Sequence, residues 1–265
     1  MCPPPGRTLS GDLMTGTGAR LRVLRDILGL SHVNLQRGAY SEVVDRAIAT
    51  GELLNQAILD TVEPGWTWST PFPTSGLGNQ LKMIARLIQA RGNAQAPVAG
   101  KFNMARQIFF CNIGGFDTHA GQVTLTPALD PLTGTHNNLL SDVSECMFAF
   151  QRAMEQLGVS DKVTTFTASD LSRTFISNSQ GTDHAWGAHQ FVMGGAVNGG
   201  ETDGSFPTFA LGGPNDTGSN GSWIPTLAVD QHAATLAKWF GVDSSEMGNI
   251  FPNLNRFGSS DLGFM

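Results

Sequence analysis

The chain has 265 residues, with 16 Lys and Arg against 22 Asp and Glu, so its formal net charge is −6. It contains no basic run, which argues against a nucleic-acid-binding surface. Thirty-two glycines and 13 prolines in a chain that is 40% hydrophobic predict many tight loops between short buried elements, and exclude a helical bundle or a disordered chain.

The first 100 residues are predicted to be mainly helical. Residues 19–30 place four apolar side chains on one helical face, and a longer helical pattern runs from about residue 40 to 62, where proline and glycine break it. The best-formed pattern is that of residues 74–92, which has a proline-rich entry and ends at a glycine.

Residues 101–265 have a different character. The short apolar run 107–113 has strand length, a helix is predicted from about 137 to 157, and the β-branched run 163–167 predicts a second strand. A third apolar stretch covers 191–197, and a last helix is expected from about 230 to 240. Strand, helix and strand in succession indicate a right-handed crossover, hence an α/β domain with a mostly parallel sheet sandwiched by helices.

Three clusters of titratable residues follow or precede the predicted strands. They are Asp117 and His119 in GGFDTH, Asp170 and Arg173 in SDLSRT, and Asp183, His184 and His189 in GTDHAWGAH. Ligands of open parallel sheets bind beyond the carboxyl ends of the strands, so the first two clusters are expected to converge at one edge of the sheet.

Aspartate together with neutral imidazole suits a divalent metal such as zinc, and more carboxylates shift the preference toward Mn, Mg or Ca. Such an ion lowers the pKa of its water toward roughly 7 and polarises a phosphoryl, sulfuryl or acyl oxygen. Asp170 and Arg173 are the catalytic candidates, with Arg173 as a planar fork for an anionic oxygen. Alternatively, the two form a local ion pair of little energetic weight.

Each residue taken alone also has a simpler interpretation. Asp117 and Asp183 could each cap a turn by bonding their own backbone two residues on. His184 could be an exposed side chain, and His189 a structural histidine beside an apolar run. His136, at a predicted helix start, is either a helix-terminus residue or a neighbour of the metal ligands, and the first interpretation is favoured.

With these residues in hand, the chain resembles the DUF1501 family of bacterial proteins, generally placed in the alkaline phosphatase and sulfatase superfamily. The resemblance covers most of the chain from about Thr70 onward, in the family's order. It rests on the segments TPFPTSGLGNQLKMIARLI, RQIFFCNIGGFDTHAGQ, LGVSDKVTTFTASDLSRT, GTDHAWGAHQFVMGGAVNGG, IPTLAVDQHAATLAKWFGV and LGFM.

The resemblance implies a single alkaline phosphatase-like domain over residues 1–265. It assigns Asp117 and His119 to a first group of metal ligands, Asp183 and His184 to a second, and His189 to the last. The family usually reads Asp-Phe-Gly-Arg-Thr where this chain reads DLSRT, and Asp-His-Gly where it reads DHA. The lost glycines restrict a backbone that elsewhere approaches a ligand closely.

Family members commonly carry a twin-arginine export signal and an N-terminal segment with the first strand and the nucleophile. The resemblance therefore implies a periplasmic or secreted protein, and this chain is expected to begin after that segment. It shows no signal peptide and no apolar stretch near the roughly 20 residues that span a bilayer.

These inferences predict a metal-dependent hydrolase that acts on a small anionic ester, a phosphate or a sulfate. Without an upstream nucleophile, only direct attack by metal-activated water is open to the residues shown. The alternatives are a non-catalytic exported protein that uses the same scaffold for binding or assembly, and a carboxylesterase-type hydrolase. The oligomeric state is left open.

Overall fold

The structure is a computed structural model in which the chain forms two compact units, and each is described by itself. The first contains Met1–Thr67 and Met83–Gln107, and the second contains Trp68–Lys82 and Ile108–Met265. The residues described are 19–31, 33–60, 67–92, 105–124 and 132–265.

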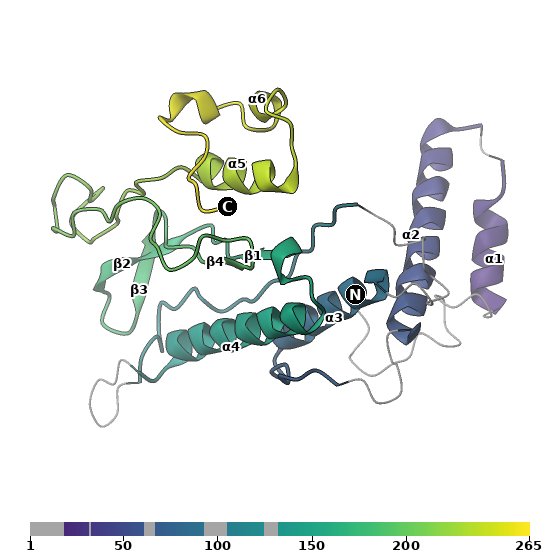
Figure 1. Ribbon diagram of the computed structural model, residues 1–265, viewed down its shortest axis with the longest axis horizontal. Helices are drawn as coiled ribbons and strands as arrows, with labels where there is room; N and C mark the ends of the chain where they lie inside the picture. Colours follow the sequence, from purple (N-terminus) through teal and green to yellow (C-terminus); the bar gives the residue numbers. More distant parts are fainter. Residues whose placement is uncertain (1–18, 32, 61–66, 93–104, 125–131) are drawn as a thin grey trace. The chain divides into compact units, whose positions relative to one another are not determined.

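The described residues of the first unit are mainly helical. Helix α1 (Ala19–Leu28) packs on α2 (Leu35–Asp60), which continues through the glycine at which the sequence pattern is interrupted. Figure 1 shows the two as a hairpin. Leu21 of α1 is fully buried, and an ion pair of 2.6 Å joins Arg25 to Glu52.

Helix α3 (Gly76–Gly92) begins in the second unit and ends in the first. At its start, the Ser75 hydroxyl accepts a hydrogen bond of 3.0 Å from the backbone N–H of Gly78, which satisfies one of the free donors of the first turn. At its other end, Ala90 is buried among leucines of α2 and α3. The first end of α3 is thus capped by a neighbouring serine, and the other packs partly on α2.

Helix α4 (Thr135–Gln156) has the longest buried face of the second unit. Its buried residues lie at spacings of three and four, as expected of an amphipathic helix: Cys146, Ala149, Phe150, Ala153 and Met154. A 3₁₀ turn, η1 (Ser160–Lys162), follows α4 and leads into the strands. The predicted helix over 137–157 is therefore present, extended by two residues at its start.

The predicted parallel sheet is wrong. Strand β1 (Thr164–Phe166) pairs antiparallel with β4 (Val192–Gly194), and β2 (Ser172–Ser177) pairs antiparallel with β3 (Thr182–Ala185). The described residues thus form a mixed α/β structure with two short two-stranded sheets, not an alkaline phosphatase-like parallel sheet between helices (Figure 1).

The reason lies in the segment 107–113, which was predicted to be the first strand. It forms no strand in the described chain, and its Asn112 backbone instead bonds the side chain of Gln80, with the N–H donating at 3.1 Å and the carbonyl accepting at 2.9 Å. β1 pairs with the third apolar run of the sequence, which makes an antiparallel partner equally well. Apolar runs predict strands, but they do not say which run pairs with which.

The C-terminal part folds over helix α5 (Val229–Phe240), and the short helices α6 (Met247–Ile250) and η2 (Leu254–Arg256) follow. The side-chain amide of Gln231 donates to the carbonyl of Ser259 at 2.8 Å, and the N–H of Leu262 donates to the Thr235 hydroxyl at 2.9 Å. These bonds hold the tail on α5. None of the described helices has the length and apolar character needed to cross a membrane.

Candidate metal centre

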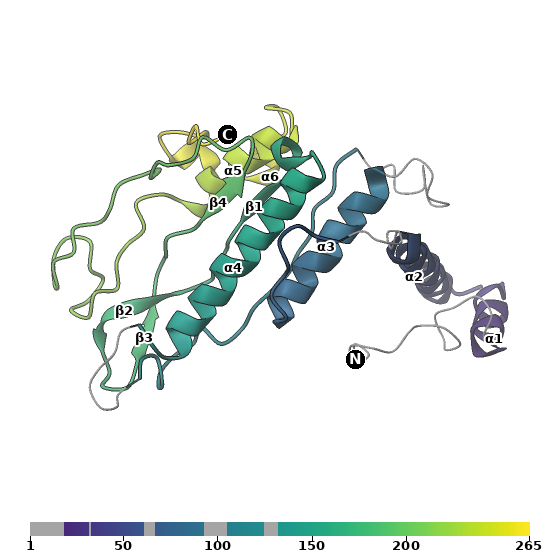
Figure 2. The same cartoon turned by 60° about the horizontal axis from the view of Figure 1, so that its bottom comes forward.

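The site is built on the β2–β3 hairpin, which lies near the start of α4 in Figures 1 and 2. Arg173 of β2 is the register partner of His184 in β3, so the two side chains lie opposite each other. The loop that carries Asp117 and His119 is joined to β3 by a bond of 3.3 Å from the N–H of Thr182 to the carbonyl of Thr118.

This loop approaches the hairpin closely because Gly181 has no side chain. A Cβ atom at Gly181 would lie 2.1 Å from the carbonyl oxygen of Thr118 and 2.7 Å from the carbonyl carbon of His119. On its other side, the loop is tied to the start of α4, where the N–H of Thr135 donates to the carbonyl of Gly121 at 3.2 Å. The backbone therefore fixes both arms of the site.

Three side chains converge and could hold a metal ion: Asp117, His119 and His184. Oδ1 of Asp117 lies 3.0 Å from Nε2 of His119 and 2.7 Å from Nε2 of His184, and the two Nε2 atoms are 3.1 Å apart. Ligand atoms about 2.0–2.2 Å from a tetrahedral zinc ion are themselves roughly 3.3–3.6 Å apart, so these three atoms, at 2.7–3.1 Å, lie a little closer together than the ligands of one ion. The group therefore joins the first predicted cluster to His184 of the third, and from the second cluster only Arg173 contacts it.

Asp183 contacts the other nitrogen of His119. Its Oδ1 lies 3.1 Å from His119 Nδ1 and accepts a second hydrogen bond of 3.0 Å from the amide of Asn178. If Nδ1 donates to this carboxylate, Nε2 of His119 keeps its lone pair for the three-residue group, which is the usual arrangement of carboxylate, histidine and metal. Asp183 thus lies where it orients a ligand, outside the group itself.

Arg173 is nearly buried, with 11% of its side chain exposed, and all three guanidinium nitrogens are engaged. Nη1 donates to Asp117 Oδ1 at 2.6 Å, Nε donates to the Thr182 hydroxyl at 3.1 Å, and Nη2 donates to the Thr182 carbonyl. The Thr182 hydroxyl in turn donates to Gln122 at 2.7 Å. The guanidinium of Arg173, which was predicted to bind a substrate oxygen, therefore bonds Asp117 and Thr182 of β3.

The partners of the two carboxylates lower their pKa values. For Asp117, the hydrogen bond from His184 and then that from Arg173 hold the pKa below its ordinary value. For Asp183, the hydrogen bond from Asn178 and then that from His119 lower the pKa. Both groups are therefore charged at neutral pH, which is the state that a metal ligand or its hydrogen-bond partner requires.

The remaining predicted residues lie outside the three-residue group. Asp170 is exposed, and Arg173 pairs with Asp117. His189 packs its ring on Phe206 at a centroid distance of 4.9 Å. His136 lies in the first turn of α4, and its pKa is lowered by burial and then by the charge of Arg173, so it is at once a helix-start residue and a neighbour of the site.

Sequence reasoning missed Asn178, Thr182 and Gln122, which join the loop to the hairpin. Asn178 bonds both Asp183 and the carbonyl of His119, at 3.0 and 3.2 Å. Nothing in the sequence distinguishes these uncharged polar residues from others in the turns around them. Their roles follow only from the pairing of β2 with β3.

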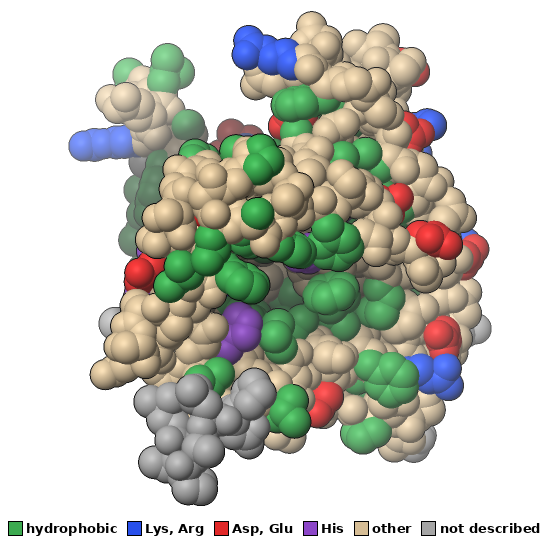
Figure 3. All heavy atoms as spheres, turned by 90° about the vertical axis from the view of Figure 1, so that its left-hand side faces the viewer, with side chains coloured by type: hydrophobic (Ala, Val, Ile, Leu, Met, Phe, Trp, Pro, Cys, Tyr) green, Lys and Arg blue, Asp and Glu red, His purple; other side chains and the backbone are tan. Residues whose placement is uncertain are grey.

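A chain of aromatic rings borders β2. Phe175 contacts Trp223 at 6.0 Å, Trp223 contacts Phe209 at 5.3 Å, and Phe209 contacts Phe206 at 6.1 Å, beside His189. More than half of the surface of each of the three phenylalanines is exposed. Figure 3 shows hydrophobic side chains gathered around a histidine on one face of the molecule.

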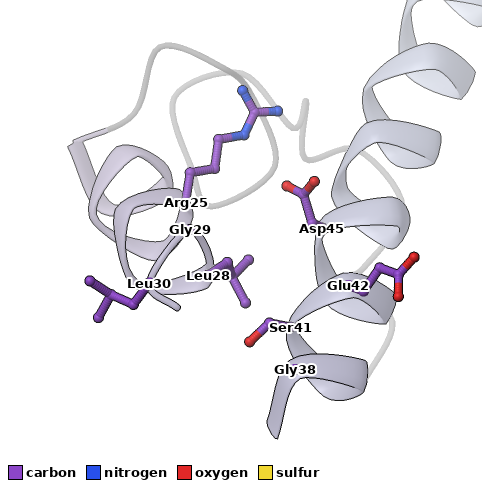
Figure 4. A pocket seen from close by; sticks show the side chains of 8 residues that line it. All are labelled: Arg25, Leu28, Gly29, Leu30, Gly38, Ser41, Glu42 and Asp45. Carbon is purple, nitrogen blue, oxygen red and sulfur yellow. The ribbon is translucent and has the colours of Figure 1, made fainter. Parts of the chain in front are cut away.

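A cavity of about 300 Å³ lies elsewhere, between α1 and α2 in the first unit. Figure 4 shows Arg25 on one side of it and Ser41, Glu42 and Asp45 on the other. It is lined by no histidine or cysteine, so its chemistry does not match the donor set of the metal centre.

The comparisons with known proteins locate the same segment. Residues 102–226 match the model of DUF1501, a family described as a protein of unknown function. The DUF1501 family is thus recognised over 125 of the 265 residues, a little under half of the chain. All of the site residues lie within the DUF1501 match, so the family's shared region contains the candidate metal centre. No curated protein and no solved structure matches the chain.

Proposed function

We propose that this chain binds a divalent metal ion through Asp117, His119 and His184 and hydrolyses small anionic esters, phosphate or sulfate. The observation that carries the proposal is the convergence of one carboxylate oxygen and two imidazole nitrogens within 3.1 Å of one another. Two histidines and one carboxylate are also the protein ligands of several zinc hydrolases, where a coordination position stays open.

The residues of the chain have distinct tasks in this proposal. Asp183 fixes the ring of His119 through Nδ1, and Arg173 fixes the carboxylate of Asp117. A divalent ion held there supplies a polarising charge and an activated water near neutral pH. The ligand side chains are about half exposed, which leaves room for a substrate oxygen.

The contacts of His119 with the two aspartates are also satisfied without a metal if His119 is doubly protonated. An imidazolium would then donate to Asp117 from Nε2 and to Asp183 from Nδ1, and the cluster would be an ion-pair network. This arrangement supports the second function, a non-catalytic protein for binding or assembly. The two functions differ in metal content, which is directly measurable.

The first experiment measures bound metal in purified protein by elemental analysis, and then the affinity of the metal-free protein for Zn²⁺, Mn²⁺ and Fe²⁺ by calorimetry. Iron belongs in the panel because two histidines and one carboxylate also ligate non-haem iron. We expect stoichiometric metal in the wild type and in Asp216→Asn, and none in Asp117→Asn. Metal-free wild type whose melting temperature does not respond to added ions would exclude the metal centre.

The second experiment screens aryl phosphate, sulfate and carboxylate esters with the same three proteins. Hydrolysis of a phosphate or sulfate ester that is lost in Asp117→Asn supports the proposal. Activity on carboxylate esters alone would move the reaction to acyl transfer. Bound metal without hydrolysis of any ester would favour the non-catalytic function.

A further inference from the structure

The side-chain amide of Gln122 lies at the centre of a polar network that reaches the metal centre. Its Oε1 accepts hydrogen bonds from the hydroxyl of Thr182 at 2.7 Å and from that of Thr118 at 3.2 Å. Both threonines are buried, with 9% and 3% of their surface exposed. A buried hydroxyl needs an acceptor for its proton, and the one amide oxygen of Gln122 serves both.

Arg173 sets the direction of these hydrogen bonds. A guanidinium has no acceptor, so Nε of Arg173 can only donate to the Thr182 hydroxyl, at 3.1 Å. The hydroxyl proton of Thr182 then points away from Arg173, and Oε1 of Gln122 is the acceptor that it meets. The bonds therefore run in one direction, from Arg173 through Thr182 to Gln122. Each bond in such a chain polarises the next, so the amide strengthens the bond that Arg173 makes.

The backbone of Gln122 is itself fixed at the start of α4. Its carbonyl accepts a hydrogen bond of 3.3 Å from the N–H of His136, and a Cβ atom at Gly134 would lie 2.5 Å from the same carbonyl oxygen. The loop can approach the helix this closely because Gly134 has no side chain. The amide is thus anchored to α4, while the two hydroxyls that it accepts come from the loop of Asp117 and from β3.

We propose that Gln122 is a positioning residue of the metal centre, which acts through Thr182 and Arg173 on the carboxylate of Asp117. Nη1 of Arg173 donates to Asp117 Oδ1 at 2.6 Å, so a shift of the guanidinium moves the oxygen that lies among the ligand atoms. The effect on metal rests on the function proposed above. The effect of Gln122 on Arg173 does not, because neither Thr182 nor Arg173 is a proposed ligand.

The test uses the full chain and has two readouts, the exchange of the Arg173 Nε proton with water in ¹⁵N NMR spectra and the affinity for Zn²⁺ by calorimetry. Gln122→Met keeps the approximate shape of the side chain without its acceptor oxygen. We expect the proton to exchange roughly tenfold faster and the metal affinity to fall about tenfold, the lower end of the cost of losing a ligand's hydrogen-bond partner. Gln122→Glu keeps the acceptor and should restore both readouts.

Gln190→Met is the matched control. Gln190 also accepts a threonine hydroxyl in the same unit, that of Thr167 at 2.9 Å, so the variant loses the same kind of bond at another place. Both readouts should equal those of the wild type. A loss that follows from general destabilisation would affect this control as well.

The route through Thr182 has its own test. Thr182→Val replaces the hydroxyl by a methyl group and should reproduce the losses of Gln122→Met. The double variant should lose no more metal affinity than Thr182→Val alone, because two residues that act along one path are not additive. If Gln122→Met does not fold, Gln122→Asn answers the same question, since its shorter side chain withdraws the oxygen from Thr182.

Three outcomes would overturn the proposal. They are an unchanged Arg173 proton in Gln122→Met, losses in Gln122→Glu as large as those in Gln122→Met, and losses that add in the double variant. A wild type that binds no metal would contradict the metal function instead, and the arginine proton would still decide whether Gln122 positions Arg173.

Discussion

Asp117 and Asp216 both lie on the surface in glycine-rich loops, and both have lowered pKa values, but their carboxylates have different partners. Asp216 accepts four backbone hydrogen bonds, two on each oxygen, from Gly212, Gly221, Gly218 and Ser222. Asp216 thus stabilises the conformation of the loop in which it lies.

The carboxylate of Asp117 is instead contacted by side-chain nitrogens. Its Oδ1 lies within 3.0 Å of nitrogens of His119, His184 and Arg173, and these residues come from three different segments. In its own loop, the N–H of His119 donates to the backbone carbonyl of Asp117, at 3.1 Å. The turn interpretation thus describes Asp216, while Asp117 has the environment of a ligand.

The largest effect is expected for Asp117→Asn. The variant replaces the charged carboxylate ligand by a neutral amide. Loss of a ligand's hydrogen-bond partner costs roughly 10–100-fold in metal affinity, and loss of the ligand itself should lower the affinity for a divalent ion by more than that. Calorimetry with Zn²⁺ measures it. Asp216→Asn removes the same charge from the same kind of loop, and equal losses in the two variants would erase the distinction drawn between them.

The next effect is that of Arg173→Lys. Lysine keeps the positive charge, but it cannot bond Asp117 and Thr182 together as the planar fork does. Metal affinity should therefore fall about 10–100-fold with the ion still bound stoichiometrically. If the affinity is unchanged, the charge alone positions Asp117, and the fork geometry of Arg173 is irrelevant to the site.

The helices, and three of the site residues, were predictable from the sequence. Apolar spacing alone predicts α3, α4 and α5, because a helix closes its own hydrogen bonds and needs only a buried face. The pairing of strands was not predictable in this way. Strands obtain their hydrogen bonds from distant segments, and the sequence offers several apolar runs of similar length.

The candidate site was predicted from residue types, and its internal roles were not. The parallel sheet predicted that Asp117 and His119 would meet Asp170 and Arg173, whereas the group that forms joins Asp117 and His119 to His184, a ligand that the family resemblance implied. The three residues converge because β2 and β3 form a hairpin whose register sets Arg173 opposite His184. This register decides which carboxylate belongs to the group and which one bonds a histidine from outside it. The sequence pattern does not predict the register.

A smaller effect is expected from Asp216→Asn on the loop around it. Burial opposes ionisation of this carboxylate, but the four backbone donors outweigh it and lower the pKa. A lowered pKa contributes stability that is present above the ordinary value, about 3.9, and is lost as pH falls through the folded value. The wild type should therefore protect the amides of Gly221 and Ser222 better than the variant at pH 7, and the two should converge near the acid limit of folding. A difference that persists in acid would show that charge is not its origin.

The smallest effect is expected for His189→Ala. The resemblance assigns this histidine to the metal, whereas its ring packs on Phe206 and lies outside the group of Asp117, His119 and His184. Metal affinity should change less than twofold, and His184→Ala, which removes one of the three donors, should lose most of it. A loss in His189→Ala as large as in His184→Ala would mean that the loop carrying His189 moves onto the ion when metal binds. The centre would then take four protein ligands, which closes the position that hydrolysis needs.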